Sequence, residues 1–566
     1  MTDTKRIIVI GGSAAGPKAA SRARRLDESA EIIMFQKEDT VSMATCAYPY
    51  YAGGILKDRL SLFSVQAGAI RDSDYYLKNK NIILKTRTEV TEIDPKQHTV
   101  AFKNLETGET GSIGYTRLII ATGASPTVPD IPGNTLQGVT CLRTLRDADY
   151  LKEVCLNGKS KKAVILGGGA LGLEICDALY ASGVSVTIVE AAPNIMNSMD
   201  VEISLLIEKH LTEKNVTVLT GRKALEFIDN GNGHIQAVRL DDDSLLECET
   251  VVISMGVIPN TKLAEKAGIA TGQFKGIIVN QHMQTSEFDI YAAGDCVESR
   301  NLVTGVNVYA PFADAAAIQG RIAGENAAKG NKAIFTGTSQ ANIFQLFEYV
   351  IASTGLTEKA AVRNNYEFET IVSAGFDKPA YMGGKTVVTK VIMEKFTDRI
   401  LGAQSIGTEY VSRLIASFSM AIKGGLSITD MSSADFPYAP LFSTPVDAGI
   451  TAVHALANKI GGLMKTVTVL GLKKRLESNE ELFILDVRTT DEFENARLDN
   501  SAVNIPLGEI RERLAEFPEN QKTEIICYCQ VSLRAYEAAR ILMQKGWRNI
   551  KVLEGGLAAW PYRLVK

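Results

Sequence analysis

The sequence predicts a multidomain protein of the α/β class. Two segments, one near residue 10 and one near residue 167, combine a short apolar run, a glycine-rich turn and a helical pattern. A short continuous apolar run is typical of a strand buried in a parallel sheet, and a glycine-rich turn after it opens the helix of a βαβ unit. A chain of 566 residues is also too long for one core and is expected to form three or four domains.

The first motif lies near the N-terminus. An apolar strand is expected at 7–10, a helix at 18–26 and a second strand at 31–35. The turn between the first strand and the helix consists of Gly11, Gly12, Ser13, Ala14, Ala15 and Gly16. Such a turn aims the N–H groups of a helix N-terminus at a pyrophosphate. Ser13 stands where GxGxxG has its second glycine, so this motif alone is weak evidence.

The second motif is complete. A strand at 162–166 leads into the turn, and a helix is expected at 173–182. The glycines of the turn are Gly167, Gly169 and Gly172. The next strand, 184–189, ends at Glu190, where an acid hydrogen-bonds the ribose 2′-hydroxyl of NAD. Because no arginine follows it to accept a 2′-phosphate, the motif predicts a site for NADH.

Three further segments complete the two nucleotide-binding units. The segments 118–123 and 251–256 are strand-to-turn patterns that close the first and second unit, and 289–295 is a strand followed by Gly294 and an acid. The expected cofactor contacts are Ala121, Thr122, Gly123, Gly256, Gly294 and Asp295. Asp295 is placed to hydrogen-bond a flavin ribityl or phosphate group. The order of FAD unit, NAD unit and FAD return predicts two Rossmann-like domains that bind FAD and NADH.

One cysteine follows the first motif at the place expected for the flavin ring. Cys46 lies in the segment 41–54, which is rich in Gly, Pro and Tyr and contains no second cysteine. A single thiol beside a flavin predicts a mixed disulfide or a persulfide with the substrate. The alternative is a buried structural cysteine, which a turn-rich setting makes less favoured.

Residues 5 to about 450 resemble the pyridine nucleotide-disulfide oxidoreductases. The segment 42–46 (SMATC) is similar to the SFxxC motif of the single-cysteine branch, which contains coenzyme A-disulfide reductase, NADH peroxidase and NADH oxidase. The segment 46–51 (CAYPYY) is similar to the CGLPYY of the coenzyme A-disulfide and persulfide reductases. Met43, Thr45, Ala47 and Tyr48 depart from the family pattern around the substrate pocket.

The resemblance implies further contacts. Gln36 replaces the acid usual at the end of the second strand, and Gln36 and Lys37 are expected to contact the FAD. Coenzyme A is the implied sulfur carrier, with Arg22, Ser42 and Thr45 expected at the substrate. The alternative for Arg22 is that it lies on the solvated face of its helix and does not contact the substrate.

Residues 331–452 carry no nucleotide motif. A half-buried strand is expected at 386–393 and a helix at 409–423. In the family this region is an α+β dimerisation domain that offers tyrosines to the partner's cysteine, which implies a homodimer. Tyr438, in a YAP segment, and Tyr381 are the candidates for a catalytic proton donor. The alternative for each is a tyrosine packed in the interface.

Residues 467–566 resemble a rhodanese domain of the α/β class, on the segments 485–488 (LDVR), 502–506 (AVNIP) and 553–556 (LEGG). Cys529 is expected at the end of a strand, with a helix at 535–545 after it. The helix dipole and Arg534, in a C-x4-R spacing, favour the thiolate there. Cys527, two residues earlier, is expected in the core of the strand.

These patterns divide the chain into consecutive parts. The expected ranges are the FAD-binding domain at 1–150 and 263–330, the NAD-binding domain at 151–262, the dimerisation domain at 331–452, a linker at 453–466 and the rhodanese domain at 467–566. The net charge of −4 gives no basic excess for nucleic acid, and no apolar run approaches the roughly 20 residues of a membrane helix. The 8 cysteines follow no disulfide or zinc spacing, which favours a cytoplasmic location and no structural metal.

Together these features predict an FAD-dependent NADH:persulfide or disulfide oxidoreductase. Cys529 would deliver sulfane sulfur, directly or on coenzyme A, to Cys46, and sulfide would be released. One alternative is a coenzyme A-disulfide reductase with a regulatory rhodanese domain. Another is an NADH peroxidase or oxidase that cycles Cys46 through sulfenic acid. A different class is a sulfurtransferase with a regulatory flavoprotein part.

Overall fold

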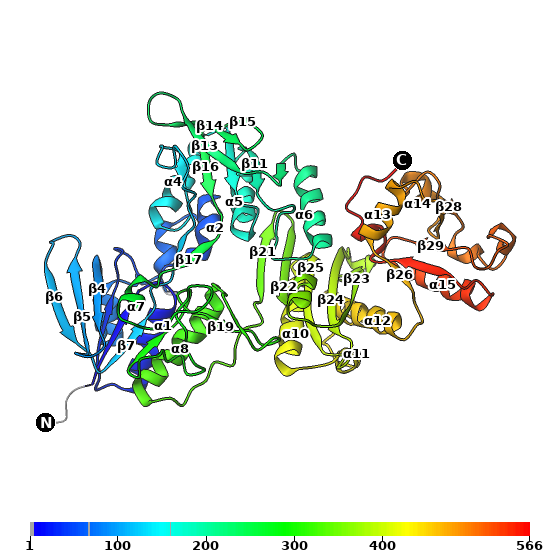
Figure 1. Ribbon diagram of the computed structural model, residues 1–566. Helices are drawn as coiled ribbons and strands as arrows, with labels where there is room; N and C mark the ends of the chain where they lie inside the picture. The colour runs from blue at the N-terminus through cyan, green and yellow to red at the C-terminus, as the bar shows by residue number, and fades with distance from the viewer. Residues whose placement is uncertain (1–4, 66–67, 159, 566) are drawn as a thin grey trace. The chain divides into compact units, whose positions relative to one another are not determined.

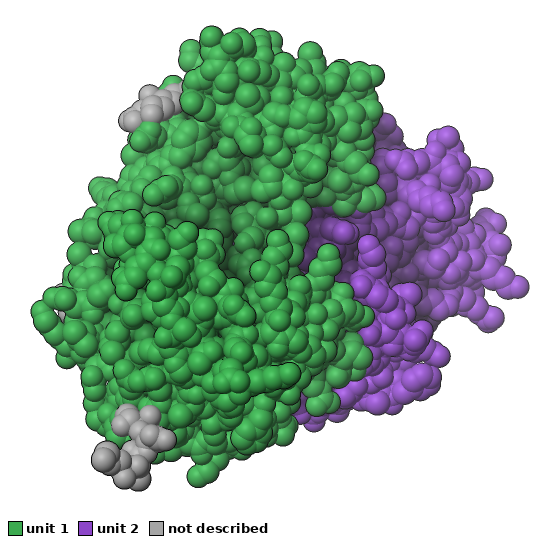
Figure 2. All heavy atoms as spheres, turned by 60° about the vertical axis from the view of Figure 1, so that its left-hand side comes forward, with its two compact units in different colours: residues 1–193, 217–340 green, residues 194–216, 341–566 purple. Residues whose placement is uncertain are grey.

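The computed structural model describes residues 5–65, 68–158 and 160–565. The chain forms two compact units, which Figure 2 shows in different colours. Unit 1 comprises 1–193 and 217–340, and unit 2 comprises 194–216 and 341–566. Among the described residues, no helix has the length and apolar character needed to span a bilayer. These residues also bring together no group of three or more His, Cys, Asp or Glu side chains that suits a metal ion.

The first sheet of unit 1 has five parallel strands in the order β18-β7-β1-β2-β3. Its strands are β1 (Arg6–Ile10), β2 (Glu31–Phe35), β3 (Ile83–Lys85), β7 (Arg117–Ile120) and β18 (Ile290–Ala292). Ile8 lies opposite Ile33 on one side and Leu118 on the other, and all three are buried. The continuous apolar runs thus fill a sheet covered on both faces, as the sequence predicts.

Two helices pack closely beside this sheet. α1 (Ala15–Leu26) and α8 (Ala313–Lys329) lie side by side in Figure 1. Their contact uses small residues, since a Cβ on Gly320 would lie 2.3 Å from the Ala15 carbonyl oxygen. The other elements of this part are α3 (Ser73–Lys80), α7 (Lys262–Lys266), β4 (Thr88–Asp94), β5 (Thr99–Asn104), β6 (Thr110–Gly114), β19 (Ser299–Arg300) and β20 (Asn307–Val308).

The second sheet of unit 1 is also parallel, in the order β12-β11-β10-β16-β9. Its strands are β9 (Val139–Thr140), β10 (Lys162–Leu166), β11 (Ser185–Glu190), β12 (Thr217–Thr220) and β16 (Thr250–Ile253). Around it are α2 (Tyr48–Ala52), α4 (Leu145–Asn157), α5 (Ala170–Ala181), β13 (Ala224–Asp229), β14 (Ile235–Leu240) and β15 (Leu245–Glu247). An antiparallel pair, β8 (Ala124–Pro126) with β17 (Val257–Pro259), joins the segments that lead into and out of this part. The predicted pair of nucleotide-binding folds is confirmed.

Unit 2 contains an antiparallel sheet in the order β21-β22-β25-β24-β23, so β23 is an edge strand. Its strands are β21 (Asn342–Leu346), β22 (Tyr349–Gly355), β23 (Phe368–Phe376), β24 (Thr386–Glu394) and β25 (Ile400–Gly407). The helices with it are α6 (Val201–Glu213), α9 (Glu358–Arg363), α10 (Tyr410–Gly424), α11 (Ile428–Ser432) and α12 (Ala448–Ile460). α12 packs on β23 and β24 and continues to Ile460, so it extends into the range 453–466 that was expected to be a linker. Asp447 caps the start of this helix, because its carboxylate accepts the N–H of Gly449.

The last part of unit 2 is a parallel sheet in the order β26-β30-β29-β27-β28. Its strands are β26 (Thr466–Val467), β27 (Phe483–Asp486), β28 (Val503–Asn504), β29 (Ile525–Tyr528) and β30 (Ile550–Leu553). Its helices are α13 (Val469–Glu477), α14 (Thr490–Asn495) and α15 (Leu533–Gln544). The α/β fold expected for the C-terminal region is confirmed.

Unit 2 also buries a lysine among carboxylates. The Lys390 side chain is 1% exposed, and its Nζ lies 2.8 Å from oxygens of both Glu202 and Glu358 and 3.4 Å from Asp200. Gln404 donates a hydrogen bond to Asp200 at 2.7 Å. Burial alone would lower the pKa of Lys390, but the three carboxylates outweigh it and raise that pKa. The cluster ties α6 and α9 to strand β24.

Candidate active site

Cys46 lies in the 3-10 turn Thr45–Ala47, immediately before α2, and is exposed. The segment before it is tied to the first glycine-rich turn, because the Ser42 N–H donates to the Gly12 carbonyl at 2.7 Å. Arg71 donates to the Ser42 carbonyl at 3.1 Å, and the hydroxyls of Ser42 and Tyr76 are 2.5 Å apart. The structure therefore places the predicted nucleophile beside the turn predicted to hold the flavin.

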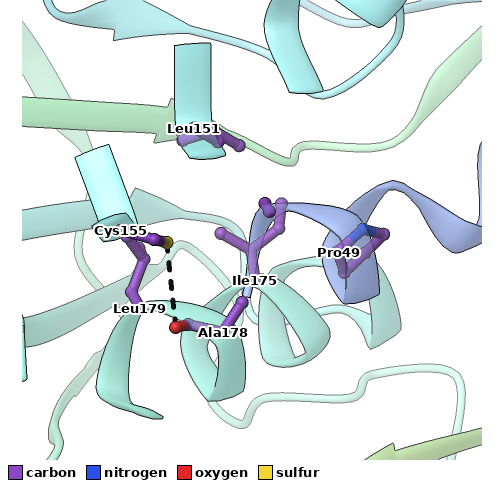
Figure 3. A pocket seen from close by; sticks show the side chains of 7 residues that line it. Pro49, Leu151, Cys155, Ile175, Ala178 and Leu179 are labelled. Atoms are coloured by element: carbon purple, nitrogen blue, oxygen red, sulfur yellow. Dashed lines mark hydrogen bonds between the residues drawn. The ribbon is translucent and has the colours of Figure 1, made fainter. Parts of the chain in front are cut away.

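The segment after Cys46 is anchored by apolar packing. Figure 3 shows a small pocket in which Pro49 of α2 faces side chains from α4 and α5. The labelled lining residues are Pro49, Leu151, Cys155, Ile175, Ala178 and Leu179. α2 is thus held by the helices of the second nucleotide-binding fold, whereas the segment before Cys46 is tied to the first glycine-rich turn through Ser42.

The groups around Cys46 favour its neutral thiol. Desolvation is the largest cause that raises the pKa of Cys46, followed by the carboxylates of Glu174 and Asp295, and the Thr45 hydroxyl opposes them. Burial raises the pKa of Glu174 to about 7, although the Tyr50 hydroxyl donates to Glu174 at 3.1 Å. The sequence motifs do not predict that Glu174 acts on Cys46. Its position in the sequence, two residues after the last glycine of the second turn and in the first turns of α5, is the one feature that could have indicated this role.

Replacing Glu174 by Gln is expected to lower the pKa of Cys46. The substitution removes a negative charge, so the thiolate forms at lower pH, by about half to one pH unit for a nearby like charge. The rate of iodoacetamide alkylation of the Cys46 peptide, followed against pH above 7 by mass spectrometry, measures this midpoint.

A matched control is Glu247→Gln, which removes an exposed carboxylate whose pKa is lowered chiefly by its hydrogen bond with Lys162. It is expected to leave the alkylation midpoint unchanged. A midpoint that stays in place or rises in Glu174→Gln would contradict the electrostatic role of Glu174.

The first nucleotide turn fits a bound dinucleotide. β1, β7 and β18 are neighbours, so the segments after their carboxyl ends, 11–16, 121–123 and 294–295, meet at one edge of the sheet. Gly11 has φ 109°, and a Cβ there would lie 2.0 Å from the Ala121 carbonyl oxygen. The Gln36 side chain accepts the Gly12 N–H at 3.0 Å. Burial raises the pKa of Asp295, with Arg143 acting in the opposite sense. These residues fit FAD.

The second turn is built in the same way. β10 lies between β11 and β16, so Gly167, Glu190 and Gly256 follow neighbouring strands. The Glu190 carboxylate accepts the Gly168 N–H and the Ala192 N–H, each at 2.8 Å. The acid therefore lies at the turn, where the ribose of NADH is expected. Gly169 is the N-cap of α5, and Gly172 is buried in its first turn.

Three predicted contacts have other partners in the structure. The Lys37 ammonium pairs with Glu89 at 3.0 Å on the surface. Arg22 pairs with Glu325 at 2.5 Å, which favours the helical-face interpretation of its charge. The Thr122 hydroxyl donates to the Asn260 carbonyl at 2.7 Å.

A basic cluster lies near the Cys46 segment in unit 1. Its members are Lys18 and Arg25 of α1, Lys80 of α3 and Arg71, which precedes α3. They are close enough to interact, since burial lowers the pKa of Lys80 most and the positive charges of Arg25, Arg71 and Lys18 lower it further. Because Arg71 also bonds the Ser42 carbonyl, the cluster begins at the segment that carries the nucleophile. Like charges held together in this way favour an anionic ligand.

In unit 2 the structure brings the two predicted tyrosines together. Tyr381 lies in the 3-10 turn Ala380–Met382 and is 74% exposed, and Tyr438 is 46% exposed. Desolvation and then the neighbouring Tyr381 hydroxyl, which is hydrogen-bonded to it, raise the pKa of Tyr438. Two hydroxyls from segments far apart in sequence thus form one exposed site.

The second cysteine site is in the C-terminal fold. Cys529 follows β29, precedes α15 and is 0% exposed. Arg534 donates two hydrogen bonds to the Glu492 carboxylate, at 2.7 and 2.8 Å, and these bonds are the main cause that lowers the pKa of Glu492 to about 2. Arg534 also hydrogen-bonds Cys529, and Glu492 therefore orients the predicted partner of the thiol. Cys527 is fully buried, as its strand position predicts, and burial raises its pKa.

Three family models match the chain. Residues 5–320 match the pyridine nucleotide-disulphide oxidoreductase model, 343–448 the dimerisation domain of the same family, and 468–561 the rhodanese-like domain. A solved structure of an NAD-dependent persulfide reductase from A. fulgidus is 37% identical, with a TM-score of 0.93, and covers 98% of this chain and 100% of its own.

Two sequence relatives each match over four-fifths of the chain. The NADH oxidase of Methanocaldococcus jannaschii is 32% identical over 80% of this chain and 100% of its own length. The NAD(P)H coenzyme A polysulfide/persulfide reductase of Pyrococcus horikoshii is 31% identical over 80% of this chain and 98% of its own length. With the two glycine-rich turns, the lone Cys46 and the Cys529 loop in place, the chain belongs to the pyridine nucleotide-disulphide oxidoreductase family and carries a rhodanese-like domain at its C-terminal end.

Proposed function

We propose that the protein is an FAD-dependent enzyme that uses NADH to reduce the sulfane sulfur of a persulfide or polysulfide to sulfide. The observation that carries this proposal is the pair of cysteine sites in one chain. Cys46 is an exposed free thiol tied to the nucleotide turns, and Cys529 is a free cysteine hydrogen-bonded by Arg534. A similar combination of folds over the whole length is found in the solved A. fulgidus persulfide reductase.

The chain's own groups supply binding and sulfur chemistry. Glu190 would hold the ribose of NADH, and the segments around Gly11, Ala121 and Asp295 would hold FAD. When bound, FAD would pass two electrons from NADH to sulfur. Cys46 would attack the outer sulfur of R–S–SH as a thiolate, forming Cys46–S–SH and releasing R–S⁻. Two electrons would then cleave the S–S bond of Cys46–S–SH, which returns the Cys46 thiolate and releases HS⁻.

Cys529 would supply the sulfur. As a thiolate beside Arg534 it would take a sulfane sulfur from a donor and hold it as Cys529–S–SH. A thiol carrier would accept that sulfur and present it to Cys46. We propose coenzyme A as the carrier, because the basic cluster of Lys18, Arg25, Arg71 and Lys80 suits its phosphates and the P. horikoshii relative is named as acting on coenzyme A persulfide.

A proton donor for the leaving thiolate would come from a second subunit. We propose a homodimer, supported by the match to the family's dimerisation domain, in which Tyr438 and Tyr381 of one subunit face Cys46 of the other. The exposure of both hydroxyls and their mutual hydrogen bond support this role. The scattered free cysteines support a cytoplasmic location.

The test is anaerobic NADH oxidation with sulfide measured alongside. The substrates are coenzyme A persulfide, coenzyme A disulfide, polysulfide and peroxide, each with the wild type and with Cys529→Ser. With polysulfide, Cys529→Ser is expected to lower sulfide release about tenfold or more, since the sulfur then lacks its linked carrier site. Coenzyme A persulfide supplied directly is expected to bypass Cys529 and to be reduced at the wild-type rate.

Two outcomes would contradict the proposal. If coenzyme A disulfide is much the better substrate and Cys529→Ser changes nothing, the protein is a disulfide reductase with a regulatory rhodanese domain. If Cys529 transfers sulfur without NADH consumption, the flavoprotein part is regulatory.

A second candidate is an NADH peroxidase or oxidase. The exposed lone thiol of Cys46 suits a cycle through sulfenic acid, and the M. jannaschii relative is named an NADH oxidase. Peroxide turnover above persulfide turnover, independent of Cys529, would favour this candidate.

A further inference from the structure

A buried carboxylate joins the rhodanese-like domain to the dimerisation domain. Glu554, at the end of β30, has a side chain that is 1% exposed. Its Oε2 accepts the Val372 N–H at 3.0 Å, and its Oε1 accepts hydrogen bonds from Lys459 at 3.0 Å and from the Thr466 hydroxyl at 2.7 Å. Because three donors satisfy this buried carboxylate, it forms a specific contact between the two domains.

One of the three donors to Glu554, the Val372 N–H, belongs to an otherwise open sheet edge. β23 is the edge strand of its sheet and pairs only with β24, so the Val372 N–H faces away from that sheet. Lys459, on α12, donates to the Thr370 carbonyl on the same edge at 2.7 Å and pairs with Glu369 at 3.0 Å. Unpaired edge groups are normally solvated or covered. Here the rhodanese-like domain covers them with the Glu554 side chain and with the 3-10 turn Gly556–Ala559, which packs on β23.

The same segment shapes the Cys529 loop. Immediately after Glu554, the Leu557 N–H donates to the Cys529 carbonyl and the Ala558 N–H donates to the Gln530 carbonyl, each at 3.0 Å. Gly556 has φ 58°, and a Cβ there would lie 2.4 Å from the Cys529 carbonyl oxygen. The segment from Glu554 to Ala558 therefore bonds the sheet edge through its first residue and the cysteine loop through its last two.

We propose that Glu554 is a positioning residue that fixes the Cys529 loop on the edge strand β23. The rhodanese-like domain then presents its sulfur from a fixed platform instead of moving freely on the linker after α12. The role in turnover rests on the proposed function, in which sulfur held at Cys529 has to reach a carrier in a defined geometry. Lys459 holds the Glu554 side chain in place from outside the rhodanese-like fold, through the hydrogen bond that it donates.

Hydrogen exchange in the full-length, FAD-loaded protein tests the docking. In Glu554→Gln only one accepting oxygen remains and an NH2 group replaces the other, so the side chain can no longer accept both the Val372 N–H and the hydrogen bonds from Lys459 and Thr466. Exchange of the 368–376 peptide is therefore expected to rise about tenfold or more. Lys459→Met is expected to raise it less, because the Val372 bond remains. The matched control is Glu509→Gln, which removes an exposed carboxylate paired with Arg513 elsewhere in the same domain and is expected to leave this peptide unchanged.

Two rate measurements test the positioning role. With polysulfide and NADH, Lys459→Met is expected to lower kcat for sulfide release about tenfold and to leave KM for NADH unchanged, since misplacement of a reacting group by about 1 Å has effects of this size or larger. Sulfur transfer from thiosulfate to cyanide is expected to stay within about twofold, because small diffusible partners reach the loop in any docking geometry. The double variant Glu554→Gln/Lys459→Met is expected to lower kcat for sulfide release no further than the worse single variant does, since the two side chains act together.

The outcomes separate this inference from the proposed function. Unchanged exchange of 368–376 in Glu554→Gln, or raised exchange with full NADH-driven sulfide release, would overturn the positioning role. Full polysulfide turnover in Cys529→Ser would show that the relay itself is wrong, and the positioning role would fall with it. The positioning role of Glu554 would be established by three results together: raised exchange of 368–376, a lower kcat for sulfide release and intact sulfur transfer from thiosulfate to cyanide. Lys459 is partly exposed, so its substitution provides a folded variant should Glu554→Gln be unstable.

Discussion

A Cys46→Ser variant is expected to lose NADH-driven sulfide release by about a thousandfold or more, because a serine hydroxyl cannot replace the thiolate that attacks sulfane sulfur. The glycine-rich turns, Glu190 and Gln36 are untouched by this change, so binding of both nucleotides is expected to persist. The measurement is anaerobic sulfide release from coenzyme A persulfide, with bleaching of the flavin absorbance by NADH recorded on the same sample.

The matched control is Cys141→Ser, which changes a half-buried cysteine whose pKa is raised by burial and which has no motif role. It is expected to keep both flavin bleaching and sulfide release. Flavin bleaching without sulfide release in Cys46→Ser would place the loss at the sulfur step. Sulfide release by Cys46→Ser within tenfold of the wild type would contradict the assignment of Cys46 as the nucleophile.

Lys390→Met is expected to reduce the free energy of local opening around β24 by about 3–5 kcal/mol, because removal of one partner leaves buried carboxylates uncompensated. Asp200, whose pKa burial already raises, and Glu202 and Glu358 would lose their common cation. Hydrogen exchange of the 386–394 peptide measures this opening free energy. Lys423→Met, at an exposed position on α10, is the control and is expected to change it little.

The pH dependence of Lys390→Met gives a further check on its cause. The charge of Lys390 lowers the pKa of Asp200 and opposes the effect of burial, so in the variant the folded-state pKa of Asp200 lies further above its unfolded value and the folded state binds a proton more readily. The stability deficit is therefore expected to be largest above that raised pKa and to shrink as the pH falls through it. A deficit that is independent of pH between 4 and 8, roughly the range over which such raised carboxyl pKa values lie, would instead indicate lost packing.

The two nucleotide-binding folds and the positions of both cysteines could be predicted from the sequence. A buried parallel strand needs a continuous apolar run, and the turn after it needs glycine where backbone approaches backbone, as at Gly11 and Gly167. These requirements are local, so they leave a local pattern. Cys46 and Cys529 lie inside such patterns, next to a turn or a helix N-terminus, and their surroundings follow from the same short segments.

Tertiary structure alone decided which distant side chains act on these cysteines. In sequence, Glu174 looks like an ordinary helix residue, and Glu492 belongs to a segment that resembles rhodanese domains but gives no partner for its side chain. Only the packing of their helices aims Glu174 at Cys46 and Glu492 at Arg534. The meeting of Tyr381 with Tyr438 depends on how the segments around them fold. The sequence places 194–216 in the NAD-binding range, but its contacts belong to unit 2.

Glu554 shows the physical reason most clearly. The LEGG segment predicts that Glu554 belongs to the rhodanese-like domain. The residues next to it in sequence do not predict that its carboxylate accepts the Val372 N–H of another domain. In the unfolded chain a polar side chain can hydrogen-bond to water and to many protein groups. Folding excludes water and places the side chain beside particular partners, so only the bonds to those partners remain. The sequence by itself determined the elements, the turns and the candidate nucleophiles of this protein, and the tertiary structure determined the electrostatic and docking partners of these residues.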